Sequence, residues 1–189
     1  MNTDPYKVIL LEGTRKVPVH MRDKLAGMSA DLAIKHPKSL FRSGNAAGSD
    51  ELFAKGVESV DATRMQQVLP YPNANTKRLH KDSPVISLAD LKDDELSELA
   101  SLGIQATPSY KSLFNLYLKN RKQTRITIKA MYLLRDALKV VGCERMGFLP
   151  ASCGYFFTDD SNPTGGGTGH TMRMCELKDI PVYTQSHWL

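Results

Sequence analysis

The feature of this sequence that most constrains its fold is a series of short apolar runs in its first half. Residues 7–11 (KVILL) are rich in β-forming residues and end before Gly13, which indicates a buried strand followed by a turn. Residues 39–43 (SLFRS) form a second such run. Residues 67–69 form a third, which stops at a Pro-Tyr-Pro turn. We therefore predict three short strands of three to five residues each.

Helical patterns fill the intervals between these runs. An apolar residue recurs every three or four positions at Met21, Leu25, Met28 and Leu32, which places these residues on one face of a helix. Pro37 ends this helix, because proline disfavours the helical conformation of the residue before it. Residues 52–57 carry a second helical face. The order strand, helix, strand, helix, strand is typical of a parallel sheet with right-handed crossovers, so we predict an α/β fold with a mostly parallel sheet.

The second half of the chain begins with a weaker pattern. Residues 73–124 contain an acidic helical segment (87–103) and a second helical segment (109–120), and we interpret this stretch as a helical insertion or cap. The α/β pattern then resumes with an amphipathic helix ended by Gly142, a strand at 154–158, a glycine-rich turn at 165–169, a helix at 171–178 and a strand at 180–183. We therefore expect one domain spanning residues 1–189.

Composition narrows the class of protein. The 189 residues are 41% hydrophobic and 24% charged, values typical of a globular protein. The sequence shows neither a signal-peptide pattern nor an apolar run of the roughly 18 residues that a membrane helix requires. The three cysteines lack paired spacing, which favours reduced thiols and a cytoplasmic location. The net charge of +5 suits an anionic ligand without requiring nucleic acid.

A first glycine-rich turn lies between the second strand and the next helix. Its glycines allow positive φ and close approach of the backbone to a ligand, and the helix that follows offers free N–H groups and the positive end of its dipole. A phosphate is the group that such a turn suits, and a plain tight turn with a helix cap is the alternative. Asp50 would cap the helix or bind a ribose hydroxyl. The candidate ligand-binding residues are Ser43, Gly44, Asn45, Gly48, Ser49 and Asp50.

A second glycine-rich turn follows a strand near the end of the chain. Four glycines in five residues cost folding entropy, so we expect this turn to approach a ligand at the carboxyl edge of the sheet. Neither turn matches the P-loop or the dinucleotide fingerprint, so no NAD or other cofactor is indicated. The candidate residues here are Gly166, Gly167, Thr168, Gly169, His170 and Thr171, with His170 as a hydrogen-bond donor or general acid.

The turn after the first strand contributes further candidates. Gly13, Thr14 and Arg15 lie beside the same edge, and Arg15 could contact phosphate or be an ordinary surface arginine. The remaining histidines show no metal-ligand spacing, so we predict no metal site.

Together, these segments resemble the SLOG superfamily, the group that contains the Lonely-guy phosphoribohydrolases and the DNA-processing protein A. Ser43-Gly44-x-Ala46-x-Gly48-x-Asp50 is similar to the superfamily motif S-G-x-A-x-G-x-D, and the segment from Gly166 to Thr171 is similar to its second glycine motif. Residues 135–142, which begin with Arg135, resemble the arginine-bearing helix between the two motifs. The resemblance implies a Rossmann-like three-layer fold and a pocket for a nucleotide or nucleotide derivative, with Arg135 among the ligand-binding residues.

The sequence departs from the hydrolase pattern at two positions. The threonine of the second motif is replaced by His170, and its catalytic glutamate by Arg173. Cleavage of an N-glycosidic bond needs a carboxylate, which Glu12, Asp50, Asp159 or Asp160 could supply. The leading hypothesis is therefore a protein that binds a nucleotide-like small molecule as a sensor or sequestering protein of phage or bacterial type. A nucleotide N-glycosidase is the alternative, so whether the chain is an enzyme stays open.

A third hypothesis is binding of single-stranded DNA, which is not favoured. It would use a basic groove around Arg121, Lys122 and Arg125 with stacking aromatics at Tyr110, Phe114 or Tyr117. The spacing of these aromatics favours instead the packed face of a helix. The 73–124 segment and the C-terminal residues 187–189 are candidate surfaces for a homo-oligomer.

Overall fold

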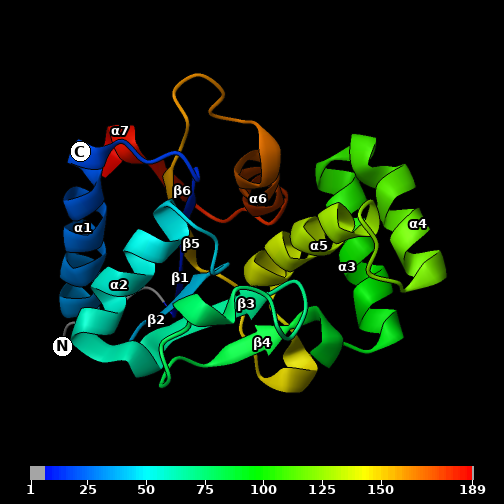
Figure 1. Cartoon of the computed structure of the whole chain (residues 1–189), viewed down its shortest axis with the longest axis horizontal. Helices are drawn as coiled ribbons and strands as arrows, with labels where there is room; N and C mark the ends of the chain where they lie inside the picture. Colours follow the sequence, from blue (N-terminus) through cyan, green and yellow to red (C-terminus); the bar gives the residue numbers. More distant parts are fainter. Residues whose placement is uncertain (1–6, 189) are drawn as a thin grey trace.

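The computed structural model describes residues 7–188 and contains a parallel sheet between two layers of helices (Figure 1). All six strands run parallel in the order β4-β3-β2-β1-β5-β6. The strands are β1 (Val8–Gly13), β2 (Leu40–Ser43), β3 (Met65–Leu69), β4 (Val85–Ser87), β5 (Cys153–Phe157) and β6 (Val182–Thr184). The three-layer α/β, Rossmann-like architecture expected from the sequence is confirmed.

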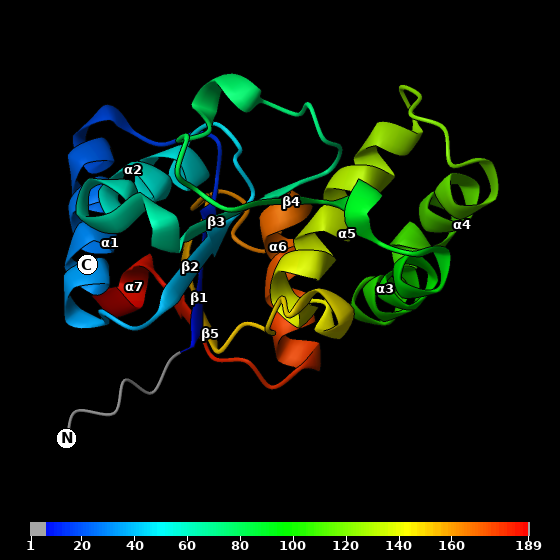
Figure 2. The ribbon, with the colours of Figure 1, turned by 90° about the horizontal axis from the view of Figure 1, so that it is seen from below.

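The helices divide between the two faces of the sheet. One face carries α1 (Arg22–Lys35), α2 (Ser49–Asp61) and α7 (Gln185–Trp188). The other carries α5 (Thr127–Val141) and α6 (Gly166–Leu177), and α3 (Asp93–Ala106) and α4 (Lys111–Asn120) pack outside α5 (Figure 2). Short 3-10 turns complete the chain at η1 (Val19–Met21), η2 (Ala62–Arg64), η3 (Thr76–Arg78), η4 (Leu88–Asp90), η5 (Pro108–Tyr110) and η6 (Glu144–Met146).

The first strand shows why the sheet needs both layers. Successive residues of a strand point to opposite faces, so Ile9 and Leu11 enter the core beneath α1 and α2, while Leu10 enters the core beneath α5 and α6. All of these side chains are fully buried. A strand buried on both faces reads as a continuous apolar run, which is what residues 8–11 display.

The segment 73–124 is not purely helical, which corrects the expectation from sequence. Residues 85–87 form β4, which pairs in parallel with β3 and extends the sheet at one edge. The strand was missed because Ser87 was assigned to the acidic helical segment, which left only two apolar residues, Val85 and Ile86, too few to indicate a strand. The remainder of the segment supplies α3 and α4, whose apolar faces cover α5.

Two helix boundaries also differ from the prediction. The acidic stretch does not form one helix. Ser87 and Asp90 make a capping box around the short turn η4, and the helix α3 begins only at Asp93. The second glycine-rich segment is not a turn preceding a helix at 171: α6 begins at Gly166, so Gly167, Thr168 and Gly169 form its first turn.

The last described helix, α7, packs against the helical layer that contains α1 and α2. Trp188 lies edge-on to Phe53 of α2, with 6.3 Å between ring centroids, and 6.4 Å from Phe157 of β5. The aromatic residue proposed for an oligomer interface is therefore engaged within its own chain. Leu189 of that proposal lies outside the described residues, and self-association stays a prediction.

Candidate functional site

A cleft of about 520 Å³ opens at the carboxyl ends of the central strands. This is the edge at which open α/β sheets bind ligands. One wall comes from the end of β1, the turn after it and the start of α2, and the other from the loop that leads into α6, with α5 between them. The lining of the cleft includes Glu12, Arg15, Asp50, Arg135, Asp136 and Gly165 to Thr168. The two glycine-rich segments thus border one cleft.

The hydrogen-bonding groups at the first glycine-rich turn are largely bound to other groups of the same chain. The carboxylate of Asp50 accepts hydrogen bonds from the backbone N–H groups of Gly13, Gly44 and Ala46, at 3.3, 3.2 and 3.4 Å. Both the amide and the hydroxyl of Ser49 donate to the carbonyl oxygen of Thr14, at 3.1 and 2.8 Å. The start of α2 is therefore occupied by a protein carbonyl, and Asp50 organises the turn instead of capping its own helix.

The glycines of this turn are required by close packing. Gly48 has a φ of 90°, and a Cβ there would lie 2.6 Å from the backbone of Arg15. A Cβ on Gly44 would lie 1.3 Å from Nη1 of Arg135, so the guanidinium fills the space that any other residue would need. Ser43, Gly44, Asn45, Gly48 and Ser49 support the cleft from behind and do not line it, whereas Gly13, Thr14, Arg15 and Asp50 do.

The second glycine-rich turn presents backbone donors to the cleft. The first intrahelical hydrogen bond of α6 runs from the amide of Gly169 to the carbonyl of Gly165, at 3.0 Å. The amides of Gly166, Gly167 and Thr168 precede it, and no side chain caps this helix end. Because the amino end of a helix also carries partial positive charge, this turn is the part of the cleft best suited to an anion.

Buried charges of α5 form the floor of the cleft. Arg135, Asp136 and Lys139 are at most 4% exposed, and Lys139 Nζ contacts Glu12 Oε2 at 2.5 Å and Asp136 Oδ1 at 2.9 Å. Arg135 Nε lies 3.1 Å from Asp136 Oδ1, and Arg135 Nη1 lies 3.9 Å from Asp50 Oδ2. The network balances three carboxyl groups against two cations.

Several atoms of this network lack a hydrogen bond. Nε and Nη1 of Arg135 and Oδ1 of Asp136 are buried and make ion-pair contacts without hydrogen-bond geometry within the described residues. Buried polar atoms are normally paired, because an unmet donor costs about 1–3 kcal/mol. The guanidinium of Arg135, which lines the cleft, therefore has unpaired donors at Nε and Nη1 among the described residues.

The carboxyl groups of the floor differ in their affinity for protons. Burial raises the pKa of Glu12 from 4.5 to about 8, although Lys139 acts in the opposite direction. Burial also acts to raise the pKa of Asp136, but the charges of Arg135 and Lys139 outweigh it and hold that pKa below 3.8. Glu12 is thus protonated near neutral pH while Asp136 is ionised.

His170 occupies the core and does not line the cleft. Its ring lies 5.4 Å from that of Tyr110, and its Nδ1 lies 2.9 Å from Thr107 Oγ1. Because Thr107 Oγ1 accepts from Arg173 Nε at 3.0 Å, its own proton is free to point at Nδ1, which makes Nδ1 the acceptor. Burial lowers the pKa of His170 to about 4, so the ring is neutral near pH 7.

The two departures from the hydrolase motif therefore have structural roles. His170 and Arg173 both bond to Thr107, which ties α6 to the end of α3, and Arg173 Nη1 also donates to the carbonyl of Thr164 before α6. His170 was expected to be a hydrogen-bond donor to a ligand or a general acid, but α6 starts earlier than the pattern indicated and the ring of His170 lies in the core, away from the lining of the cleft. Thr171 faces the floor instead, where its hydroxyl donates to Glu12 Oε1 at 3.0 Å.

Part of the cleft was not predicted from the sequence. Asp136, Lys139, Tyr132, Lys129 and Tyr110 were not among the ligand-binding candidates, although all but Lys139 line it. Arg135 lies over the ring of Tyr132, and so does Arg15, at 5.5 and 5.8 Å from the ring centroid. The signal was present, because Arg135, Asp136 and Lys139 are charges on the buried side of an otherwise apolar helix.

Two negative findings apply to residues 7–188. In that range, no group of three or more histidine, cysteine, aspartate or glutamate side chains is arranged to hold a metal ion. Over the same range, every helix is too short or too polar to cross a membrane.

Comparison with known proteins relates this chain to a solved structure through its fold. No family model matches the sequence, and no curated protein matches it. Among solved structures, the chain is similar to DNA processing protein A from Helicobacter pylori, described for its single-stranded DNA binding mode. The TM-score is 0.54 at 15% sequence identity, and the match covers 96% of this chain and 65% of that one. At this identity the likeness establishes the Rossmann-like fold.

Proposed function

We propose that this protein is a member of the SLOG superfamily that binds a nucleotide or nucleotide-derived phosphate ligand in the cleft at the carboxyl edge of the sheet. The observation that carries the proposal is the convergence, on one cleft, of the uncapped amino end of α6 and the orphaned guanidinium of Arg135. Backbone amides and a guanidinium are the groups that proteins use to bind phosphate.

The cleft offers complementary surfaces for the other parts of a nucleotide. Its volume of about 520 Å³ lies within the range of small-molecule sites. Tyr110 and Tyr132 supply aromatic surface for a base, and ionised Asp136 is an acceptor for sugar hydroxyls. Arg15 and Lys129 are exposed cations at its border, suited to attract an anion.

A thermal-shift comparison of inorganic phosphate, adenosine, AMP, ADP and ADP-ribose tests the proposal. A nucleotide present at 100 times its Kd should stabilise the fold by about 2.7 kcal/mol, which corresponds to a rise in Tm of about 5–10 °C for a chain of this size. Adenosine should raise the Tm less than AMP. No shift with any phosphorylated compound at millimolar concentration would contradict the proposal.

A pair of matched arginine variants locates the binding. Arg15→Gln removes a cation from the cleft, whereas Arg22→Gln removes an exposed cation from the start of α1. The first should weaken AMP binding about fivefold or more, and the second should leave it unchanged. Equal effects would show that only the overall charge matters.

A second candidate function is hydrolysis of an N-glycosidic bond, which the floor of the cleft favours. A carboxyl group protonated near neutral pH (Glu12) and one ionised there (Asp136) are held against the same lysine, and such a pair can divide the roles of acid and carboxylate. Release of free adenine from AMP, abolished in Asp136→Asn, would establish the activity. Binding of AMP without release of base would restrict the protein to the binding role.

Single-stranded DNA binding, the property named for the structural neighbour, has less support. Phe114 and Tyr117, two of the three stacking candidates, are buried in the core at 0% and 7% exposure. Tyr110 lines the cleft. An oligothymidylate in the same thermal-shift experiment separates the hypotheses, because binding to it should fall steeply with salt.

A further inference from the structure

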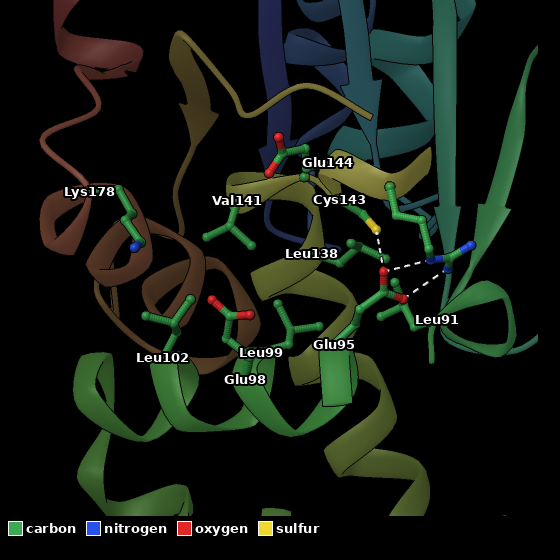
Figure 3. Close-up of a pocket in the computed structure, with 12 residues that line it drawn as sticks. Leu91, Glu95, Glu98, Leu99, Leu102, Leu138, Val141, Cys143, Glu144 and Lys178 are labelled. Atoms are coloured by element: carbon green, nitrogen blue, oxygen red, sulfur yellow. Dashed lines mark hydrogen bonds and ion pairs between the residues drawn. The ribbon is translucent and has the colours of Figure 1, made fainter. Parts of the chain in front are cut away.

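A second pocket lies between α3, the carboxyl end of α5 and the residues that follow α5 and α6. Its volume is about 600 Å³, within the range of small-molecule sites. Figure 3 shows Leu99, Leu102, Leu138 and Val141 around its base, and Leu91 extends this apolar surface. None of its lining residues belongs to the nucleotide cleft.

Three of the five charged residues that line this pocket are acidic, and the pairing of Glu95 with Arg145 leaves two carboxylates and one lysine. In Figure 3, Glu98, Glu144 and Lys178 lie around the apolar base, and these side chains have no ion pair or hydrogen bond within residues 7–188. The helices α5 and α6 end at Val141 and Leu177, beside the pocket, and the carboxyl end of a helix carries partial negative charge. The pocket therefore favours a cation, in a chain whose net charge is +5.

The remaining polar side chains of the pocket bind one another. Arg145 Nε donates to Glu95 Oε1 at 2.7 Å and Arg145 Nη2 to Glu95 Oε2 at 2.8 Å, and the thiol of Cys143 donates to Glu95 Oε1 at 3.4 Å. The side-chain hydrogen bonds from Arg145 lower the pKa of Glu95 to about 2, and burial raises the pKa of Cys143. Glu95 is thus already neutralised and Cys143 is a thiol, which leaves Glu98 and Glu144 as the acidic groups available to a ligand.

We propose that this pocket is a second ligand site, which binds a small organic cation with an apolar body. The apolar body would cover the leucine and valine side chains of the base, and the cationic group would lie between the carboxylates of Glu98 and Glu144. The positive charge of Lys178 would repel a second cationic group, so a ligand of single positive charge fits best. Binding is non-covalent, since the thiol is protonated.

Three probes of one shape and different charge test this proposal: phenethylamine, 2-phenylethanol and 3-phenylpropionate. Titrations followed by the NMR methyl signals of Leu99, Leu102 and Val141 should give a Kd on the order of 1 mM for phenethylamine. The alcohol should bind more weakly and 3-phenylpropionate weakest. Equal affinity for all three, or tightest binding of the anion, would overturn the proposal.

Charge variants identify the groups responsible. The double variant Glu98→Gln/Glu144→Gln should weaken phenethylamine binding about fivefold to tenfold, because each exposed ion pair contributes modestly. The control Asp23→Asn/Asp31→Asn changes the net charge equally on α1, far from this pocket in the sequence and on the other layer of helices, and should have no effect. Lys178→Gln should strengthen binding. If the control weakens binding as much as the test variant, the pocket does not select the cation.

Discussion

The proton on Glu12 gives a stability prediction that the structure allows to be worked out. The carboxyl group is 5% exposed and sits against Lys139 and Thr171, and burial raises its pKa to about 8 from an ordinary value of 4.5. The folded state therefore holds this proton at pH values where the unfolded chain has released it. By linkage, the free energy of unfolding falls as the pH rises from about 4.5 to about 8, and levels off above that range.

The pH range of the measurement can be chosen so that Glu12 dominates. His170 has a folded pKa of about 4 against an ordinary 6.5, so its contribution to stability rises with pH over that interval and is complete above it. Between pH 6.5 and 8, the contribution of Glu12 still makes the free energy of unfolding fall as the pH rises. Each pKa unit corresponds to about 1.4 kcal/mol, so this interval of 1.5 units removes about 2 kcal/mol.

Glu12→Gln is the perturbation that isolates this contribution. Glutamine keeps the size and the hydrogen-bonding oxygen of the protonated acid but cannot ionise. Urea denaturation at pH 6.5 and 8 should show a loss of about 2 kcal/mol in the wild-type protein and a much smaller loss in Glu12→Gln. Glu51→Gln, at a partly exposed glutamate of α2, should retain the wild-type difference. Parallel pH profiles for the wild type and Glu12→Gln would refute the buried, protonated glutamate.

Three further predictions concern packing and burial. Gly44→Ala should weaken AMP binding at least tenfold, because its Cβ would displace the guanidinium of Arg135, and an unchanged affinity would exclude Arg135 from binding. At the control position Gly27, a Cβ meets no atom within 4 Å, so Gly27→Ala should raise the free energy of unfolding in urea by about 0.5–1 kcal/mol. Arg42→Met should lower the free energy of unfolding in urea by about 2–5 kcal/mol. The buried guanidinium donates to the side-chain amide oxygen of Gln66 and to two backbone carbonyls, and all three acceptors would lose their donor. A loss below about 1 kcal/mol would show that those acceptors rehydrate. Burial raises the pKa of Cys175 to about 12, so this thiol should resist iodoacetamide at pH 8 in the native protein and react in urea. Mass spectrometry of labelled peptides measures the reaction, and rapid labelling of the native protein would contradict the burial of Cys175.

The local pattern of the sequence was sufficient for the α/β class and for most of the elements. The first strand is buried on both faces, so its residues had to be apolar without interruption, and that run is visible in the sequence. The helix from 22 to 35 shows its apolar face at the expected spacing and ends where Pro37 requires. These signals are local, because they depend on which face of one element is buried. The strand β4 shows no such signal, because only two of its residues, Val85 and Ile86, are apolar and Ser87 continues into the acidic segment.

The candidate site was predicted in outline and corrected in its detail. Glycine content located both turns, because a close approach of two backbones excludes a Cβ whatever the rest of the fold does. What each turn does depends on its neighbours. The start of α2 is occupied by the carbonyl of Thr14, a residue 35 positions away, while the start of α6 stays uncapped. No pattern within either turn distinguishes them.

The sequence by itself determined most of the strands and helices in their order, the places where only glycine fits and the presence of charged residues in a buried helix. The tertiary structure alone decided that Glu12 and Thr171, 159 positions apart, meet at one floor, and that His170 turns into the core. The physical reason is that desolvation and Coulomb interactions depend on distance in space. A carboxyl group acquires a pKa of about 8 only where the assembled sheet and helices remove water from it.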